Sequence, residues 1–515
     1  MNGAESLIRS LVDAGVNICF ANPGTSEMHL VQAIDAVPEM RAVLCLFEGV
    51  CTGAADGYGR MQGVPATTLL HLGPGLGNGI ANLHNARRAA TPIINLIGNH
   101  ALYHVKYDAP LTSDIDTLAK NVSSWIKSDS TARSLAADGM AALQAANTLK
   151  PGSLGQISTL IVPADACWGE AEGPVGTLDV PAIVEVDDKV IADVAGKIDS
   201  NSMILLNNDG LSLPARIAAS RIQAETGCRI ALTTFPRRVD GGPGTPVFER
   251  LPYFPEHVMA TLKNINTLVL AGSDAPVSFF AYPDYPSELV PDSCEAVVLA
   301  DGNENVTLAL QSVADSINAP ESGYPVFDKR IRQVPAGKLS VATAATLLAG
   351  LLPENSIVCG DSGGGGAFFV PAQETTPHTW LNLTGGSIGQ GGPVSVGAAI
   401  ARPESRVLAL LGDGAAMYTN QAFWTQAREG LDVTTVIYSN HRYGILETEY
   451  LRLGVNEIGD RAGDLFDLSR PFIDFVSLAG SMGVPGRVAK SCEEFSAALE
   501  LSFSQPGPFV IEARV

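Results

Sequence analysis

The stretch that decides the fold is Val407–Gly444, which reads VLALLGDGAAMYTNQAFWTQAREGLDVTTVIYSNHRYG. It begins with a short apolar run, Val407–Leu411, and continues with good helix formers over Ala415–Glu429. A β-branched, apolar run follows at Val433–Tyr438. A strand, a helix and a second strand in this order are typical of a parallel βαβ unit, so the stretch predicts an α/β fold built on a parallel sheet.

Polar residues stand where the two predicted strands end. Asp413 lies between Gly412 and Gly414 after the first strand, and Asn440 follows the second. Because the carboxyl ends of parallel strands meet at one edge of the sheet, we expect the two side chains to lie close together. Their oxygens suit Mg²⁺ or Ca²⁺, and a helix beginning near Ala415 would direct free N–H groups at a phosphate. A Gly-Asp-Gly turn alone is a weak signal, but its pairing with Asn440 favours a metal and phosphate site.

The composition limits the class of protein. The chain has 515 residues, of which 46% are hydrophobic and 17% charged, so we expect a globular protein of two to four domains. A net charge of −21 argues against nucleic acid or an anionic membrane as partner. The eight cysteines form no Cys-x-x-Cys pair, which supports neither a zinc site nor a disulfide framework. With no signal-peptide pattern and no apolar run of about 20 residues, a cytoplasmic protein is expected.

Three polar residues in the first part of the chain also follow predicted strands: Thr25, Glu48 and His71. Each has an ordinary structural explanation, such as a turn, a helix N-terminus or a hydrogen-bonded histidine. One sheet edge could nevertheless gather all three. The glycine-rich segment Gly73–Gly79 after His71 suggests a loop that permits close backbone approach, with a helix following over Ile80–Ala90.

Two stretches rich in Gly, Pro and charged residues, Glu170–Asp188 and Ala319–Ala336, are typical of linkers. They divide the chain into three predicted units, each a doubly wound α/β domain with a mostly parallel sheet. The middle unit has no Gly-x-Gly-x-x-Gly fingerprint and therefore gives no reason to expect a dinucleotide. The predicted domains are 1–170, 187–318 and 339–515.

The Gly-Asp-Gly motif, with Asn440 27 positions after Asp413, resembles the cofactor and metal motif of thiamine-diphosphate-dependent enzymes. The resemblance implies that Asp413, Asn440 and the backbone carbonyl of Arg442 hold the metal. Ser439 stands where the family often has another Asn, a departure that leaves the ligands intact. The bulky Ile388 would wedge the cofactor into a bent form. The resemblance implies further cofactor contacts from Gly363, Gly364, Gly386, Ser387, Gly412, Gly414, Ala415, Tyr443 and Gly444.

The segment Phe47-Glu48-Gly49, followed by a helix that ends in Gly57-Tyr58-Gly59-Arg60, is similar to the glutamate motif of the same family. The resemblance implies that Glu48 hydrogen-bonds the cofactor's aminopyrimidine ring and so promotes loss of the thiazolium proton. Family members place this glutamate of one subunit against the cofactor of another. A homodimer at minimum, and more often a homotetramer, is therefore expected.

Two motifs are similar to the benzoylformate decarboxylase branch. A histidine, His71, precedes a glycine-rich segment, and Asn22–Glu27 matches a loop whose serine aligns with Thr25. The resemblance implies that Thr25 and His71 hold the substrate carboxylate or move protons, with Leu446 beside the substrate. Acetolactate synthases usually lack the histidine but keep Gly-Pro-Gly, which is present here at 73–75.

Two departures accompany this resemblance. The second active-site histidine of the branch is replaced by Ala281 or Tyr282. Glu447 and Glu449 are acidic where aromatic-acid decarboxylases tend to be apolar, and a solvated helix face is the simplest interpretation.

The resulting prediction is thiamine-diphosphate-dependent decarboxylation of a small 2-oxo acid, with carboligation as a further outcome. An acetolactate-synthase-like carboligase remains an alternative. A non-catalytic relative that binds a nucleotide or the cofactor is an alternative of another class. Acetolactate synthases carry FAD in the middle domain, but no residue pattern here requires it, so FAD is not expected.

Overall fold

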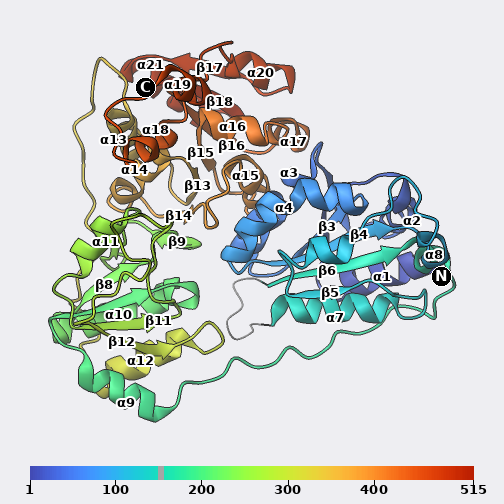
Figure 1. The fold of residues 1–515 in the computed structure, drawn as a ribbon, viewed down its shortest axis with the longest axis horizontal. Helices are drawn as coiled ribbons and strands as arrows, with labels where there is room; N and C mark the ends of the chain where they lie inside the picture. Colours follow the sequence, from blue (N-terminus) through green and yellow to red (C-terminus); the bar gives the residue numbers. More distant parts are fainter. Residues whose placement is uncertain (149–155) are drawn as a thin grey trace.

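The computed structural model describes residues 1–148 and 156–515, which form three sheets with helices on both faces (Figure 1). The first sheet has six parallel strands in the order β2-β1-β3-β4-β6-β5. Its inner strands are almost wholly buried because both faces are covered. Its strands are β1 (Ile18–Asn22), β2 (Arg41–Leu44), β3 (Ala66–Leu70), β4 (Pro92–Asn99), β5 (Trp125–Lys127) and β6 (Gln156–Pro163).

Helices from two separate hydrophobic clusters cover the faces of this sheet. One face carries α1 (Gly3–Asp13), α2 (Met28–Asp35), α7 (Leu135–Asn147) and α8 (Ala164–Trp168). The other carries α3 (Glu48–Gln62), α4 (Leu72–Arg88) and α6 (Ile115–Ala119). The short elements η1 (Thr25–Glu27) and α5 (Leu102–Val105) complete this part.

The middle sheet has five parallel strands in the order β10-β8-β7-β11-β12. They are β7 (Ser202–Leu206), β8 (Arg229–Leu232), β10 (Glu249–Arg250), β11 (Thr267–Ala271) and β12 (Glu295–Ala300). The helical elements are α9 (Asp188–Lys197), η2 (Asn208–Leu211), α10 (Leu213–Thr226), α11 (Pro255–Leu262) and α12 (Val306–Ser316). An extended segment joins the first part to α9 along the edge of the molecule (Figure 1).

The third sheet has seven strands in the order β17-β18-β16-β15-β13-β14-β9. Six are parallel: β13 (Ser356–Asp361), β14 (His378–Leu381), β15 (Val407–Gly412), β16 (Val433–Ser439), β17 (Gly486–Ala489) and β18 (Phe509–Arg514). The seventh, β9 (Arg238–Gly241), comes from the middle part of the chain and pairs antiparallel with β14. The predicted α/β fold with three mostly parallel sheets is therefore confirmed.

Helices again cover both faces of the third sheet. One cluster includes α13 (Val341–Leu351), α14 (Gly363–Ala372) and α21 (Cys492–Phe503). The opposite cluster includes α15 (Gly391–Ala401), α17 (Ala422–Glu429) and α20 (Phe475–Ser481). The remaining helices are α16 (Asp413–Tyr418), α18 (Gly444–Leu451) and α19 (Asp460–Phe466).

The first and third units pack through α3 and α15, which cross at glycines (Figure 1). A Cβ on Gly397 would lie 1.8 Å from the carbonyl oxygen of Ala54, and one on Gly57 would lie 2.1 Å from that of Val394. The backbones can approach this closely only because these positions lack side chains. Near the crossing, Arg60 pairs with Asp56.

Two sequence predictions of local structure are wrong. The helix predicted over Ala415–Glu429 is broken between α16 and α17, where Thr419 turns its hydroxyl to the carbonyl of Gly389 at 2.6 Å. The glycine-rich segment predicted as a loop after His71 forms the first turns of α4. Its glycines permit close packing instead: a Cβ on Gly79 would lie 2.8 Å from the Thr52 side chain.

The run of glycines at residues 363–366 likewise begins a helix, α14. Ser362 caps α14, because its Oγ accepts a hydrogen bond from the N–H of Gly365 at 2.9 Å. Over the described residues, no helix is both long and apolar enough to cross a membrane.

Candidate active site

The carboxyl ends of β15 and β16 lie side by side because the two strands pair in parallel. Asp413 begins α16 directly after β15, and its carboxylate reaches the loop that follows β16. Oδ2 accepts hydrogen bonds from the backbone N–H groups of Asn440, at 3.1 Å, and His441, at 2.6 Å. Oδ1 accepts one from the N–H of Gly414 at 2.8 Å. One carboxylate therefore fixes the loop after β16 relative to the helix after β15.

Asp413 is only 4% exposed. Burial is the main influence on the pKa of its carboxyl and raises it, while the three backbone N–H groups act in the opposite direction. A buried carboxylate whose hydrogen-bond donors are all neutral fits a bound cation, which would offset the cost of burying the charge. Within the described parts of the chain, no three His, Cys, Asp or Glu side chains gather as metal ligands. Such a cation would therefore need amide, carbonyl or phosphate oxygens as well.

The loop after β16 presents oxygens of this kind. The Oδ1 atom of Asn440 accepts a hydrogen bond from the N–H of Arg442 at 3.1 Å, which closes a tight turn. The Arg442 guanidinium turns toward Glu447, 3.2 Å away. The ring of Tyr443 lies against Gly414, where a Cβ would be 2.2 Å from it. The amide oxygen of Asn440 and the carbonyl of Arg442 thus belong to the loop that Asp413 holds.

A third strand end, that of β13, adjoins the same edge because β13 pairs with β15. Gly363 and Gly364 open α14 there, so their N–H groups belong to the first turn of a ten-residue helix and suit a phosphate. Gly364 also admits the Tyr438 ring, which would lie 2.8 Å from a Cβ. Ala415 lies buried in the first turn of α16 beside them.

Asp361, the last residue of β13, ties the loop before α15 to this edge. Its Oδ2 accepts hydrogen bonds from the N–H groups of Gly389 and Gly391, both at 2.9 Å. Burial raises the pKa of Asp361 to about 7. In the segment before Gly389, Gly386 has φ +77° and lies against the ring of Phe279 from the middle part of the chain. Ile388 in the same segment is half-buried. The backbone of Ser387 is held by Asn85.

In the first domain, Glu48 and His71 meet at the beginning of α4. The Glu48 carboxylate accepts a hydrogen bond from Asn78 Nδ2 at 2.9 Å. A Cβ on Gly75 would lie 3.1 Å from Glu48 Oε1 and 3.4 Å from His71 Cβ, so both side chains border the same turn. Thr25 is exposed in η1, near this group along the chain.

Glu27, the last residue of the Asn22–Glu27 loop, completes this group. It caps the short helix η1, because its Oε2 accepts a hydrogen bond from the N–H of Gly24 at 2.8 Å. The same atom lies 2.8 Å from His71 Nδ1, and Glu27 is fully buried. Gly98 makes room for it, because a Cβ there would lie 1.9 Å from Oε1. A Glu at the end of a turn motif gave no sign that it would face a histidine from another strand.

The middle part contributes Tyr282, whose hydroxyl donates to the Glu449 carboxylate on α18 at 3.1 Å. Glu449 is therefore not part of a freely solvated helix face, and that prediction is wrong. Tyr282 finds this partner because its loop lies over α18. Ala281 is exposed, and so is Leu446 on the same helix as Glu449.

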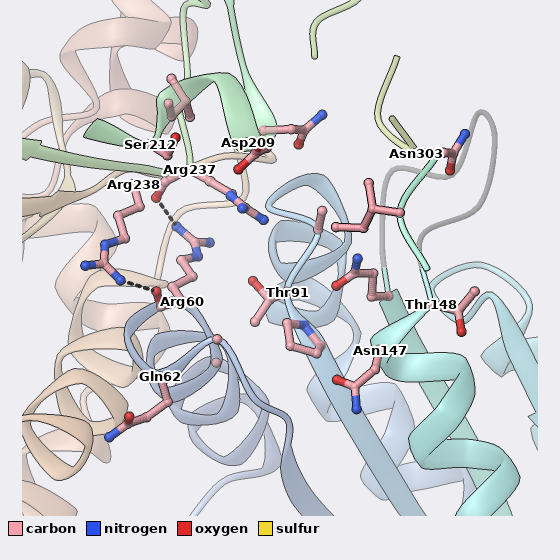
Figure 2. Close-up of a pocket in the computed structure, with 18 of the residues that line it drawn as sticks. Arg60, Gln62, Thr91, Asn147, Thr148, Asp209, Ser212, Arg237, Arg238 and Asn303 are labelled. Carbon is pink, nitrogen blue, oxygen red and sulfur yellow. Dashed lines mark hydrogen bonds between the residues drawn. The ribbon is translucent and has the colours of Figure 1, made fainter. Parts of the chain in front are cut away.

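A cavity of about 1030 Å³ lies between the first and middle parts of the chain (Figure 2). Arg60, Arg237 and Arg238 gather on one side of it, and Asp209 lies above them in this view. Arg238 donates to the carbonyl of Arg60 at 3.0 Å. None of the predicted site residues lines this cavity. The ends of β13, β15 and β16 instead lie together at one edge of the third sheet.

Comparison with known proteins finds two family models in this chain. Residues 1–121 match the description "Thiamine pyrophosphate enzyme, N-terminal TPP binding domain". Residues 339–513 match "Thiamine pyrophosphate enzyme, C-terminal TPP binding domain". The two matches contain Glu48 and His71, and Asp413 and Asn440, respectively.

Relatives extend the similarity to the whole chain. A Mycobacterium tuberculosis protein named provisionally as an acetolactate synthase large subunit, IlvX, is 50% identical and covers 100% of this chain and 99% of its own length. Benzoylformate decarboxylase of Pseudomonas aeruginosa is 25% identical over 97% of this chain and 96% of its own. Among solved structures, the thiamine diphosphate-dependent 4-hydroxybenzoylformate decarboxylase of Rhodococcus jostii RHA1 superposes with a TM-score of 0.86 at 23% identity, covering 100% and 99%. This last likeness shows the fold.

Proposed function

This chain belongs to the thiamine pyrophosphate enzyme family, and from that premise we propose that it decarboxylates a 2-oxo acid without oxidation. The observation that carries the proposal is the hydrogen-bonded junction of Asp413 with the Asn440 loop at a shared strand edge. It supplies one buried negative charge, two neutral oxygens and adjacent helix N-termini. This donor set fits a divalent cation that holds a diphosphate.

The proposed cation, Mg²⁺ or Ca²⁺, is held by the carboxylate of Asp413, the amide oxygen of Asn440 and the backbone carbonyl of Arg442. The N–H groups of Gly363 and Gly364 contact the diphosphate from α14. The other proposed cofactor contacts come from three segments of the same edge. They are Gly386, Ser387 and Ile388; Gly412, Gly414 and Ala415; and Tyr443 and Gly444.

When bound, thiamine diphosphate supplies an electron sink for the bond that releases CO₂. Glu48, oriented by Asn78, activates the cofactor by hydrogen-bonding its pyrimidine ring. His71, oriented by Glu27, transfers protons, and Thr25 holds the substrate carboxylate. Leu446 lies beside the substrate on α18. FAD is not part of the proposal.

The proposal includes an assembly of identical chains. The contacts of Glu48 described above come from its own domain, whereas the cation site lies on the third sheet. A homodimer in which Glu48 of one chain faces the cofactor of the other brings the two halves together, and a homotetramer would pair two such dimers. The enzyme is proposed to act in the cytoplasm.

A second candidate is an acetolactate-synthase-like reaction, in which the product of the first 2-oxo acid is joined to a second. The relative at 50% identity carries that name, which favours this candidate. The presence of His71, typical of the decarboxylase branch, favours release of aldehyde. Tyr282 already donates its hydroxyl to Glu449 and therefore does not replace the missing second histidine in a simple way.

The deciding experiment offers the enzyme a panel of aliphatic and aromatic 2-oxo acids with thiamine diphosphate and Mg²⁺, and measures CO₂ release. Product analysis with pyruvate then separates acetaldehyde from acetoin or acetolactate. Aldehyde as the main product would support the first candidate, and acetolactate would support the second. No CO₂ from any acid would contradict both.

A further inference from the structure

Asn85 is a fully buried residue near the end of α4 in the first domain. Both polar atoms of its side chain bind the backbone of one residue in the third domain. Nδ2 donates to the carbonyl oxygen of Ser387 at 2.8 Å, and Oδ1 accepts from the N–H of Ser387 at 3.2 Å. Such a two-point contact fixes both the position and the orientation of the peptide it holds.

The neighbours of this contact tighten the same connection. Thr384 donates its hydroxyl to the carbonyl of Asn85 at 2.7 Å, and His84 Nε2 lies 3.0 Å from the carbonyl of Gly385. A Cβ on Gly385 would lie 2.5 Å from Asn85 Oδ1, so only glycine allows the loop to come this close. The segment 384–387 is therefore held by α4 of the first domain. Two residues after this segment, the N–H of Gly389 donates a hydrogen bond to the Asp361 carboxylate.

The same helix also holds Glu48. Asn78, which donates to the Glu48 carboxylate, lies seven residues before Asn85 on α4. Seven residues are nearly two helical turns, so the two asparagines share a face about 10 Å apart. One rigid helix thus carries a contact to the proposed activating carboxylate and a contact to the proposed cofactor loop of the same chain.

We propose that Asn85 is a positioning residue that sets the Ser387–Ile388 segment in its cofactor-binding shape before the cofactor arrives. The inference rests on the proposed function, because it takes this segment to be a cofactor loop. Neither Asp nor Leu can replace Asn85. A carboxylate has no donor for the carbonyl of Ser387, and an apolar side chain leaves both backbone groups unpaired in a buried place.

The matched control is Asn95 in β4, which is also fully buried and bridges side chains on the neighbouring strands β3 and β6. It donates to the hydroxyl of Thr159 at 3.0 Å and accepts from that of Thr68 at 2.8 Å. Asn95→Asp introduces the same buried charge in the same domain, away from Ser387. Comparison of the two variants separates the loop contact from a general loss of stability.

The first measurement is hydrogen exchange in the full-length protein without cofactor. In N85D, amides of residues 384–389 should exchange about tenfold faster than in the wild type, while those of residues 92–99 stay unchanged. N95D should show the reverse. Unchanged exchange at residues 384–389 in N85D would overturn the inference, whatever the enzyme binds.

The second measurement is calorimetric titration with thiamine diphosphate and Mg²⁺. N85D should bind the cofactor about tenfold more weakly than the wild type, and N95D within about twofold. If N85D fails to fold, Asn85→Gln keeps the donor and acceptor, but its extra methylene displaces the loop, so weaker binding is expected there too. Wild-type affinity in the folded variant would refute the role of Asn85, whereas a wild-type protein that binds no cofactor would refute the proposed function instead.

Discussion

The carboxylate of Asp413 and the backbone N–H of Asn440 are joined by a hydrogen bond of 3.1 Å between the ends of two adjacent parallel strands. The bond joins the first residue of α16 to the loop after β16. Together with the hydrogen bond from the N–H of His441 to the same carboxylate, it holds that loop in place. The side chain proposed as a metal ligand therefore also organises the loop that carries the other ligands.

Replacement of Asp413 by Asn should abolish cofactor loading. The amide keeps an acceptor for the backbone N–H groups but loses the charge that favours a cation. We expect affinity for thiamine diphosphate with Mg²⁺ to fall by about a hundredfold, measured by calorimetry. Asp187→Asn is the control, because Asp187 caps α9 in the middle part of the chain, outside the third sheet. Equal binding by both variants would contradict the proposed metal site.

Glu48→Gln should stop turnover while it leaves the fold intact. Asn78 can still donate to the amide oxygen of the new side chain, so we expect the melting temperature to change by no more than about 2 °C. The proposed activation needs an acidic group, so kcat should fall about a thousandfold. The exposed Glu39→Gln should leave kcat unchanged. Full activity of Glu48→Gln would exclude its role.

Glu27→Gln should slow the reaction by changing the histidine it contacts. An ionised Glu27 accepts the Nδ1–H of His71 and leaves Nε2 as the free nitrogen. A glutamine can instead donate to Nδ1, which moves the proton to Nε2. We expect kcat to fall by about 10–100-fold with little change in KM. Ser26→Ala removes the 3.2 Å contact to His71 and the 2.6 Å hydrogen bond to Glu27 Oε1 but leaves the Glu27–His71 contact, and it should cost less than about fivefold. Similar losses in both variants would argue against a specific effect of Glu27.

Asp361→Asn should change how stability depends on pH. Burial raises the pKa of Asp361 from 3.8 to about 7, so the native state holds this proton more tightly than the unfolded chain. The contribution of Asp361 to the free energy of unfolding therefore decreases as the pH rises from about 4 to about 7, and this contribution stays low at higher pH. The amide does not titrate. We expect the melting temperature of the variant, relative to wild type, to rise by roughly 5 °C between pH 5 and pH 8, measured without cofactor. A difference that is constant across this range would refute the assignment.

Arg452→Lys should loosen α18. Arg452 binds both oxygens of Glu256, at 2.6 and 3.0 Å, and stacks on Phe254 and Tyr282 with centroid distances of 4.4 and 4.7 Å. Lysine keeps the charge but loses the planar fork and the stacking. We expect the melting temperature to fall by about 3 °C and KM to rise several-fold.

The control for this prediction is Arg428→Lys. Arg428 lies over Trp424 at 5.2 Å, but it is half-exposed and makes a single 3.8 Å ion pair. Arg428→Lys should therefore lower the melting temperature by less than about 1 °C. An equal or larger effect at Arg428 than at Arg452 would contradict the role of the planar fork and the stacking of Arg452 in holding α18.

The architecture was predictable because it depends on local signals. The apolar run Val407–Leu411 and the β-branched run Val433–Tyr438 are strands in the structure, since strands buried on both faces favour such residues. The family was predictable from Asp413 and Asn440, whose positions after two strands follow from the same pattern. The glycine-rich segments were misread because glycine signals either a loop or close packing, and only the neighbouring element decides between them.

The contacts within the site were much less predictable. Glu27 contacts His71, which follows a different strand. Asn85 contacts Ser387, which lies 302 residues later in the sequence. Nothing in the local sequence says which distant backbone a buried polar side chain will meet. Glu449 shows the same limit: its acidic character suggested solvent, whereas the middle part of the chain brings Tyr282 to it.

The antiparallel strand β9 has a practical consequence for anyone who builds hybrids of these enzymes. Residues 238–241 complete the border of the third sheet although they are encoded within the middle segment. A transplant that exchanges the middle segment as one cassette would also replace this border and expose β14 to a mismatched neighbour. Chimaeras should therefore retain residues 238–241 with their original C-terminal sheet, and place the crossover points on either side of them.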